Sequence, residues 1–198
     1  MLIGLTGGVA TGKSLVSDEL GRLGAGIVDA DVISRGIYVR GAPAYGEIIR
    51  EFGKSILNSS GEVDRKALGR IVFADSNKLR TLEEITHPAI RERIREEVVE
   101  RKKTHAVVVV VAPLLFETGL DKEMDKTVVV YANEAEILKR LMKREAIDEA
   151  MAKRIISAQL PIEEKKAKAD YVIDNNNGIK KTIAAVGKLY EIFLSKGI

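Results

Sequence analysis

The chain has 198 residues, enough for one domain with a sizeable buried core. It carries 32 Lys and Arg against 29 Asp and Glu, and because the two signs are interspersed, the net charge of +3 is weak evidence for nucleic-acid binding. The absence of cysteine excludes disulfides, thiolate metal sites and a thiol nucleophile. The longest apolar run, 106–112, is too short to span a membrane, so a soluble cytoplasmic protein without a signal peptide is expected.

Five short apolar runs predict β-strands. They lack an alternation of polar and apolar residues, which is typical of strands buried on both faces of a parallel sheet. Because helical patterns separate the runs, the sequence predicts an α/β fold with helices covering a five-stranded parallel sheet. The predicted strands are residues 2–6, 26–29, 106–112, 127–131 and 171–173.

The segment after the first predicted strand matches the pattern G-x-x-x-x-G-K-S and opens a predicted helix. Gly7 and Gly12 allow the backbone to wrap closely around phosphate groups, which the loop N–H groups and the helix N-terminus bind. Lys13 is expected to reach the β- and γ-phosphates, and the Ser14 hydroxyl to coordinate Mg²⁺. The segment therefore predicts a nucleoside triphosphate site.

Two acids, Asp29 and Asp31, lie at the carboxyl end of the second predicted strand. For Asp31 the residues alone leave several roles open: a helix N-cap, a catalytic base, or an acid that assists a metal. The third predicted strand is followed by Pro113 and ends without an acid, so Asp31 is the available carboxylate if Ser14, phosphates and water do not hold the metal alone. Asp29 is expected to support Asp31 or a metal-bound water.

About seventy residues of helical pattern then separate the second and third strands. Such an insert at the carboxyl end of a strand is typical of a subdomain that covers a substrate. His87 precedes Pro88, which predicts a helix boundary with His87 as a locally bonded or a catalytic residue. Arg91 is expected to bind a phosphate or to pair with nearby glutamates, and Asp64 and Ser76 to act as N-caps. The predicted helices are residues 32–39, 43–53, 64–74, 77–86 and 88–103.

A second helical stretch follows the fourth predicted strand and is rich in basic residues. Asn133 and Asp148 occupy positions typical of N-caps, and Pro161 precedes a further helix. Most of the charges in this stretch are expected to lie on solvated faces. The other predicted helices are residues 13–23, 134–145, 149–159, one from 161 onward and 179–195.

A phosphate loop alone does not separate kinases from GTPases or mechanical ATPases. The guanine signature N-K-x-D is missing, because the single Asn-Lys pair, 77–78, is followed by Leu79 and Arg80. A D-x-x-G match at 18–21 lies inside a predicted helix. Two alternatives remain: a nucleoside monophosphate kinase, which should have a smaller insert, and a nucleotide-dependent switch or nucleic-acid ATPase, whose turnover a macromolecule should stimulate.

Over essentially its whole length the chain resembles the dephospho-coenzyme A kinases. The stretches that carry the resemblance are "IGLTGGVATGKS", "VDADVISRG", "FGKSILNSSGEVDRKALGRIVF", "HPAIRERI", "VAPLLFETGL" and "RIISAQLPIEEKKAKADYVIDNN". The resemblance implies transfer of the γ-phosphoryl group of ATP to the ribose 3′-hydroxyl of dephospho-coenzyme A, with Mg²⁺. It further implies a single domain over 1–198 with a phosphate-loop kinase core, a helical coenzyme A-binding insert, 32–105, and a helical lid, 134–169. Both partners are small molecules, with no nucleic acid and no membrane, and the chain is expected to be a monomer or weak oligomer.

The resemblance also implies roles for individual residues. Asp31 falls on the catalytic base, and Arg144 on the lid arginine that contacts phosphates, with Arg140 and Arg154 nearby. Many relatives have Arg-Asp where this chain has Arg144-Glu145, so the bracing of the lid is expected to differ. The expected ATP-binding residues are Gly7, Gly8, Val9, Ala10, Thr11, Gly12, Lys13, Ser14, Leu15, Arg140, Arg144, Asn175 and Asn177. The expected acceptor-binding residues are Asp31, His87, Arg91, Pro113, Leu114, Leu115 and Glu117.

Overall fold

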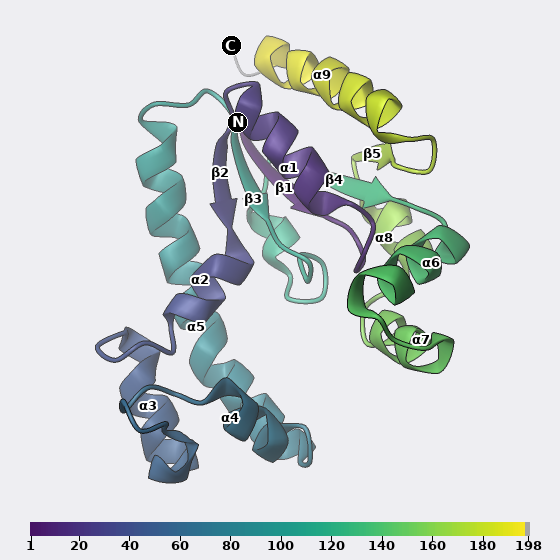
Figure 1. Ribbon diagram of the computed structural model, residues 1–198. Helices are drawn as coiled ribbons and strands as arrows, with labels where there is room; N and C mark the ends of the chain where they lie inside the picture. The colour runs from purple at the N-terminus through teal and green to yellow at the C-terminus, as the bar shows by residue number, and fades with distance from the viewer. Residues whose placement is uncertain (197–198) are drawn as a thin grey trace. The chain divides into compact units, whose positions relative to one another are not determined.

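Five strands pair in parallel in the order β2-β3-β1-β4-β5, in a computed structural model that describes residues 1–196 (Figure 1). This confirms the predicted five-stranded parallel sheet. The strands are β1 (Leu2–Thr6), β2 (Gly26–Asp29), β3 (Val108–Val111), β4 (Lys126–Tyr131) and β5 (Tyr171–Asp174). Because all five run in the same direction, their carboxyl ends meet at one edge of the sheet, and the phosphate loop leaves β1 at that edge.

Burial differs between the middle and the margins of the sheet. The three central strands, β1, β3 and β4, are buried over almost their whole length, as their apolar sequences predict. The expectation of burial on both faces is wrong for the two edge strands. Alternate residues of β2 are half-buried, and Val172 of β5 is 40% exposed. An edge strand has a neighbour on one side alone, so helices cover it less completely.

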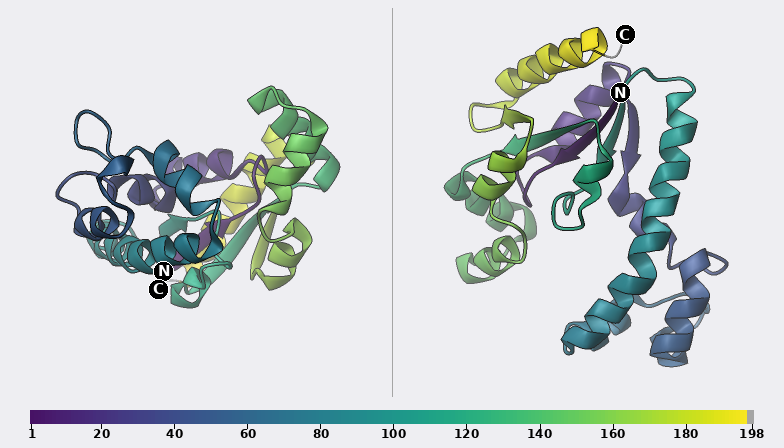
Figure 2. Two further views of the ribbon diagram at one scale, coloured as in Figure 1. Left: turned by 90° about the horizontal axis from the view of Figure 1, so that it is seen from below. Right: turned by 180° about the vertical axis from the view of Figure 1, so that it is seen from behind.

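Helices α1 (Lys13–Arg22) and α9 (Ile179–Lys196) pack side by side over one face of the sheet (Figures 1 and 2). Ile3 and Leu5 of β1 point into this layer, where they share a core with Leu20 of α1 and Phe193 of α9. On the opposite face, a Cβ at Gly4 would lie 2.8 Å from side-chain atoms of both Leu115 and Met124. The segment after β3 therefore covers this opposite face of the sheet at the middle of β1.

Residues 30–97 form a second compact unit with a core of its own, separate from the unit made by residues 1–29 and those from Val98 onward. Asp64 caps α4 as predicted, because its carboxylate accepts hydrogen bonds from the backbone N–H groups of Lys66 and Ala67. Ser76 is not the cap of the next helix; Asp75 accepts from Asn77 and Lys78 instead. The elements of this unit are α2 (Ala30–Gly36), α3 (Pro43–Phe52), η1 (Lys54–Ile56), α4 (Arg65–Val72) and most of α5 (Ser76–Lys102).

The predicted helix boundary at His87-Pro88 is wrong. Helix α5 runs from Ser76 to Lys102 without interruption, with Pro88 inside it. A proline removes one backbone hydrogen bond and strains the preceding turn, which favours a break but does not require one. Here Ile85 before the proline and Ala89 after it pack against the same core, and burial on both sides holds the helix together.

Three helices and one short turn complete the first unit after β3. Asn133 and Asp148 cap their helices as predicted, by accepting hydrogen bonds from the backbone N–H groups of Glu136 and Met151. Pro161 immediately precedes the last of these helices, also as predicted. The elements are η2 (Leu120–Glu123), α6 (Glu134–Glu145), α7 (Glu149–Ser157) and α8 (Ile162–Lys168).

Asp170 ties the start of β5 to the start of β4, and its removal should weaken the fold. Its carboxylate accepts hydrogen bonds from Lys126 Nζ (2.7 Å) and from the N–H and Oγ1 of Thr127 (both 2.9 Å). These donors, Lys126 foremost, lower the pKa of Asp170. We expect Asp170→Asn to reduce the free energy of unfolding at pH 7 by about 1 kcal/mol, since water screens a carboxylate that is 35% exposed.

The pH dependence supplies a further check on Asp170. A lowered pKa stabilises the fold above the pKa of the unfolded chain, and this stability is lost as the pH falls through the lower, folded value. The difference between the wild type and Asp170→Asn, measured by denaturant unfolding, should therefore shrink below about pH 4. Asp18→Asn, at an exposed carboxylate of α1, serves as the control. A constant difference down to pH 2 would contradict the assignment.

Candidate active site

The phosphate loop needs glycine at both of its predicted glycine positions. A Cβ at Gly7 would lie 2.7 Å from the Thr11 hydroxyl and 2.7 Å from the Val130 carbonyl oxygen. Gly12 has φ +96°, a left-handed conformation that side chains oppose, and its missing Cβ faces the amide of Asn175. The two glycines of the sequence pattern therefore allow the tight turn. The pattern does not reveal that Val130 and Asn175 are packed against them.

The polar side chains of the loop are held by its own backbone. Thr11 is fully buried, and its hydroxyl donates to the Gly8 carbonyl at 2.9 Å. Lys13 Nζ donates to the carbonyls of Gly7 (2.8 Å) and Gly8 (2.9 Å), so the ammonium group lies over the loop. Together with the N-terminus of α1, this concentrates positive charge where a polyphosphate would bind.

The oxygen ligands beside the phosphate loop suit a magnesium ion that arrives bound to a nucleotide. Within residues 1–196, no three Asp, Glu or His side chains are grouped closely enough to hold a metal. Ser14 is exposed in the first turn of α1, directly after Lys13, and Asp29 ends β2 at the same edge of the sheet. Mg²⁺ usually keeps several waters and takes one or two protein ligands together with substrate phosphates, which fits a single hydroxyl here.

Asn175 is buried and holds several elements together. Its side-chain amide donates to the Thr11 carbonyl (2.8 Å) and accepts from the Thr182 hydroxyl (2.8 Å), while its own carbonyl accepts from Arg140 (2.8 Å). The side chain therefore positions the phosphate loop, a role that differs from the expected contact with ATP. Asn177, by contrast, is exposed and bonds to Asp174 at 3.4 Å.

The predicted lid arginines have different surroundings. Arg140, on α6, is 30% exposed and pairs with Glu136 at 3.0 Å, in addition to its bond to Asn175. Arg144 lies one turn further along, is 56% exposed, and pairs with the adjacent Glu145 at 2.8 Å. The Arg-Glu sequence thus forms a local ion pair. Arg140 is fastened to the core, whereas Arg144 lies at the surface of the lid.

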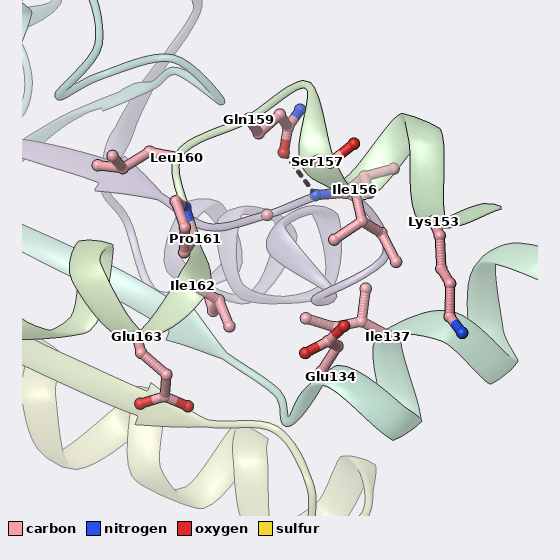
Figure 3. A pocket seen from close by; sticks show the side chains of 12 residues that line it. Glu134, Ile137, Lys153, Ile156, Ser157, Gln159, Leu160, Pro161, Ile162 and Glu163 are labelled. Atoms are coloured by element: carbon pink, nitrogen blue, oxygen red, sulfur yellow. Dashed lines mark hydrogen bonds between the residues drawn. The ribbon is translucent and has the colours of Figure 1, made fainter. Parts of the chain in front are cut away.

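A cavity of about 490 Å³ lies between the phosphate loop and the helices α6 to α8 (Figure 3). On one side Gln159 Oε1 accepts a hydrogen bond from the Val9 N–H at 3.0 Å. The remaining wall is mostly apolar. Apart from Gly8 and Val9, sequence reasoning missed its residues, because they are scattered over three helices and a loop. They are Glu134, Ile137, Lys153, Ile156, Ser157, Gln159, Leu160, Pro161, Ile162 and Glu163.

The segment after β3 was expected to bind the acceptor, and its residues lie in different surroundings. Leu115 is fully buried against Gly4, so it packs the sheet and is not available to a substrate. Glu117 forms an ion pair with Lys165 at 2.7 Å, and Lys165 itself is fully buried. Leu114 is 44% exposed, and Pro113 is half-buried with its carbonyl bound to Lys165.

In the second unit, the continuous helix α5 brings His87 and Arg91 onto one face, four residues apart. They line a groove of about 650 Å³ together with Arg95, which lies one turn further along. The predicted break at Pro88 separated His87 from the helix that carries Arg91 and Arg95, so the common face of the three residues is apparent only on the unbroken helix. Glu47, Glu84 and Glu92 lie in the same groove.

The two acids after β2 occupy different elements. Asp29 is the last residue of β2, paired in register with Val111, and is half-buried. Asp31 is exposed and lies in the first turn of α2. Since α2 begins at Ala30, the N-cap position that precedes the helix belongs to Asp29. The carboxylate of Asp31 therefore lies where the helix dipole favours an acid.

A phosphate loop between β1 and α1, a five-stranded parallel sheet and basic helices after β4 together define a phosphate-loop kinase. A family model described as "Dephospho-CoA kinase" matches residues 1–181. The chain therefore belongs to the dephospho-CoA kinase family, an ATP-dependent family. Its activity is that of a dephospho-CoA kinase, which carries out the final step of coenzyme A biosynthesis.

Individual relatives agree with this assignment. The chain is 47% identical over 184 residues to dephospho-CoA kinase from Carboxydothermus hydrogenoformans, an alignment that covers 91% of this chain and 88% of the relative. It is 43% identical over 189 residues to the enzyme from Aquifex aeolicus, covering 96% and 95%. The solved structure of dephospho-CoA kinase from Campylobacter jejuni has a TM-score of 0.74 and 30% identity, covering 100% of this chain and 98% of that chain.

Proposed function

We propose that the enzyme transfers the γ-phosphoryl group of Mg²⁺-bound ATP to the ribose 3′-hydroxyl of dephospho-CoA. The observation that carries this proposal is the phosphate loop, where two sterically required glycines and the ammonium group of Lys13 form a site for a polyphosphate. Membership of the dephospho-CoA kinase family supplies the acceptor.

In the proposed mechanism, Asp31 orients the attacking hydroxyl and accepts its proton as the new P–O bond forms. Its place two residues after the carboxyl end of β2 supports this role, because active sites of open parallel sheets lie beyond that edge. Lys13 and Arg144 balance the negative charge of the transferring phosphoryl group. Ser14 would hold the magnesium ion, which when bound neutralises charge on the β- and γ-phosphates.

We assign the helices α6 and α7 to a lid that closes over the nucleotide. The predicted lid, 134–169, also includes α8. Arg144 is exposed on α6, where its guanidinium group pairs with Glu145. Closure of the lid would bring this group to the phosphates. Closure would also exclude water and so suppress hydrolysis of ATP.

We propose that the helical unit binds the acceptor, as expected for the insert 32–105. The groove formed by His87, Arg91 and Arg95 of α5 supports this, because two guanidinium groups and an imidazole suit the phosphate groups of dephospho-CoA.

No helix within the described residues is long and apolar enough to cross a membrane. We further propose a cytoplasmic monomer or weak oligomer.

The decisive test is an assay of the purified protein with ATP, Mg²⁺ and dephospho-CoA. We expect formation of coenzyme A, detected by chromatography, and loss of activity when EDTA removes the metal, with recovery on adding Mg²⁺. A panel of nucleoside monophosphates as acceptors is the control for the alternative kinase reaction, and should give turnover at least about 100-fold lower. Absence of coenzyme A, or equal use of a nucleoside monophosphate, would overturn the proposal.

A further inference from the structure

Lys165 is a fully buried charge in a helix whose other charged residues are exposed. Its Nζ forms an ion pair with Glu117 Oε1 at 2.7 Å and donates a hydrogen bond to the Pro113 carbonyl at 2.6 Å. Burying an ion costs several kcal/mol, and an apolar side chain of similar size often stabilises a fold as well as a buried ion pair does. Stability alone is therefore a weak reason for a lysine at this position.

The groups bound to Lys165 lead directly to the phosphate loop. The Pro113 carbonyl also accepts a hydrogen bond from the hydroxyl of Thr6 at 3.2 Å. Thr6 is the last residue of β1 and immediately precedes Gly7. Lys165 thus fixes the segment after β3 to the exact strand end from which the phosphate loop starts.

The same ion pair fixes the end of the lid. Glu117 Oε1 accepts a hydrogen bond from the Leu160 N–H at 3.1 Å, and the neighbouring Gln159 accepts from the Val9 N–H at 3.0 Å. Both residues lie in the short connection between α7 and α8, and Figure 3 shows Gln159 reaching the loop from there. The end of α7 is therefore attached to the phosphate loop by one direct bond and, through Glu117 and Lys165, by a second route.

Helix α8 itself is attached to the sheet. Glu163 accepts a hydrogen bond from the Tyr131 hydroxyl at 2.7 Å, and Lys166 lies over the Tyr131 ring at 4.2 Å from its centre. The opposite end of the lid is held as well, because the Asn133 N–H donates to Asn176 at 2.9 Å. Helices α6 and α7 are thus fastened at both ends, at Asn133 and at Leu160.

We infer that Glu117 and Lys165 are positioning residues, which set the base from which α6 and α7 close over the phosphate loop. In this arrangement α8 belongs to the core, and the moving part of the lid ends before Gln159. A lid arginine acts on the transferring phosphoryl group only if closure places it accurately, and an error of about 1 Å can cost roughly 100-fold in rate. The inference rests on the proposed lid closure and names residues that control it.

The test uses Lys165→Met, Glu117→Gln and the double variant. We expect each single variant to lower kcat about tenfold or more while KM for ATP changes by less than about threefold, because closure is lost in the transition state and nucleotide binding is not. The ratio of ATP hydrolysed to coenzyme A formed should rise, since an ill-fitting lid admits water. Thermal unfolding identifies any loss of folded protein.

The double variant separates positioning from stability. With both charges removed no buried ion lacks a partner, so its thermal stability should return close to that of the wild type. We expect kcat to stay low and the hydrolysis ratio to stay high in this stable protein. Tyr131→Phe is the matched control, because it removes the other hydrogen bond of α8, to Glu163, and should leave kcat within about twofold of the wild type.

Recovery of kcat in the double variant together with stability would overturn the inference, as would single variants that lose stability while turnover per folded molecule is unchanged. An equal loss of kcat in Tyr131→Phe would also overturn it, since loosening α8 in general would then explain the effect. The wild-type enzyme, measured alongside the variants, separates a failure of the proposed reaction from a failure of this inference. Failure of the wild type to form coenzyme A overturns the proposed reaction, whereas normal wild-type turnover with unaffected variants overturns this inference alone.

Discussion

Replacing Asp31 with asparagine is expected to lower kcat by about 10²- to 10⁴-fold, the usual contribution of a general base. The amide keeps the size and shape of the side chain but cannot accept the proton of the attacking hydroxyl. Nucleotide binding should survive, because Thr11 and Lys13 donate to carbonyl groups within the loop itself, and the loop belongs to the other compact unit. ATP affinity, measured by calorimetry, should therefore change by less than about threefold.

Folding should be almost unaffected by this substitution. Asp31 is exposed and lies in the first turn of α2. Removing an acid from the first turn of a helix costs about 0.3–1 kcal/mol. Asp64→Asn is a suitable control, because it removes a carboxylate from the same helical unit while asparagine preserves the cap of α4. Its kcat should equal that of the wild type.

Two results would contradict the assignment of Asp31. Near-normal turnover in Asp31→Asn would exclude it as the base. A similar loss of turnover in Asp64→Asn would show that the helical unit is sensitive to any change of charge.

Gly12→Ala is expected to damage the phosphate loop strongly, although it adds a single carbon atom. The backbone at φ +96° opposes a Cβ by about 1–2 kcal/mol. The new methyl group would also collide with the amide of Asn175, and overpacking of this kind typically costs about 1–3 kcal/mol. We therefore expect a loss of about 2–4 kcal/mol in the free energy of unfolding, by denaturant titration.

Nucleotide binding should fall with stability in Gly12→Ala. Asn175 holds the loop through the Thr11 carbonyl, so displacing its amide shifts the N–H groups that face the phosphates. We expect ATP affinity to drop about tenfold or more, which calorimetry would detect.

Gly8→Ala provides a matched control for Gly12→Ala within the same loop. A Cβ at Gly8 would meet its nearest neighbours at 3.4 Å or more, which is ordinary contact, and the backbone there is not left-handed. Stability should change by less than about 0.5 kcal/mol. Equal destabilisation of the two variants would show that the conformation of Gly12 and its contact with Asn175 are not the cause.

Much of the fold was predictable because it depends on local chemistry. Apolar runs without alternation mark the central strands, since a strand covered on both faces has no polar side to show. The spacing of Gly7, Gly12, Lys13 and Ser14 marks the phosphate loop, since its turn is made by consecutive residues. The caps Asn133 and Asp148 were equally predictable, because each bonds to its own helix.

Other features depend on residues that are distant in the chain and could not be predicted this way. Pro88 favoured a helix break, yet burial of Ile85 and Ala89 in one core keeps α5 continuous. The continuous helix places His87 in the same groove as Arg91 and Arg95. The packing of Leu115 is a second case, because the missing side chain of Gly4, more than a hundred residues earlier, makes room for it against the sheet.

The amino-acid pattern alone therefore determines the phosphate loop and the strands, because each requires residue types at fixed, short separations. The supports of the site depend on the tertiary structure. Asn175 meets Thr11 across 164 residues, and Lys165 meets Pro113 across 52. Such contacts leave no periodic signal, since a buried amide or lysine gains its role from whichever partner the fold brings within hydrogen-bonding distance.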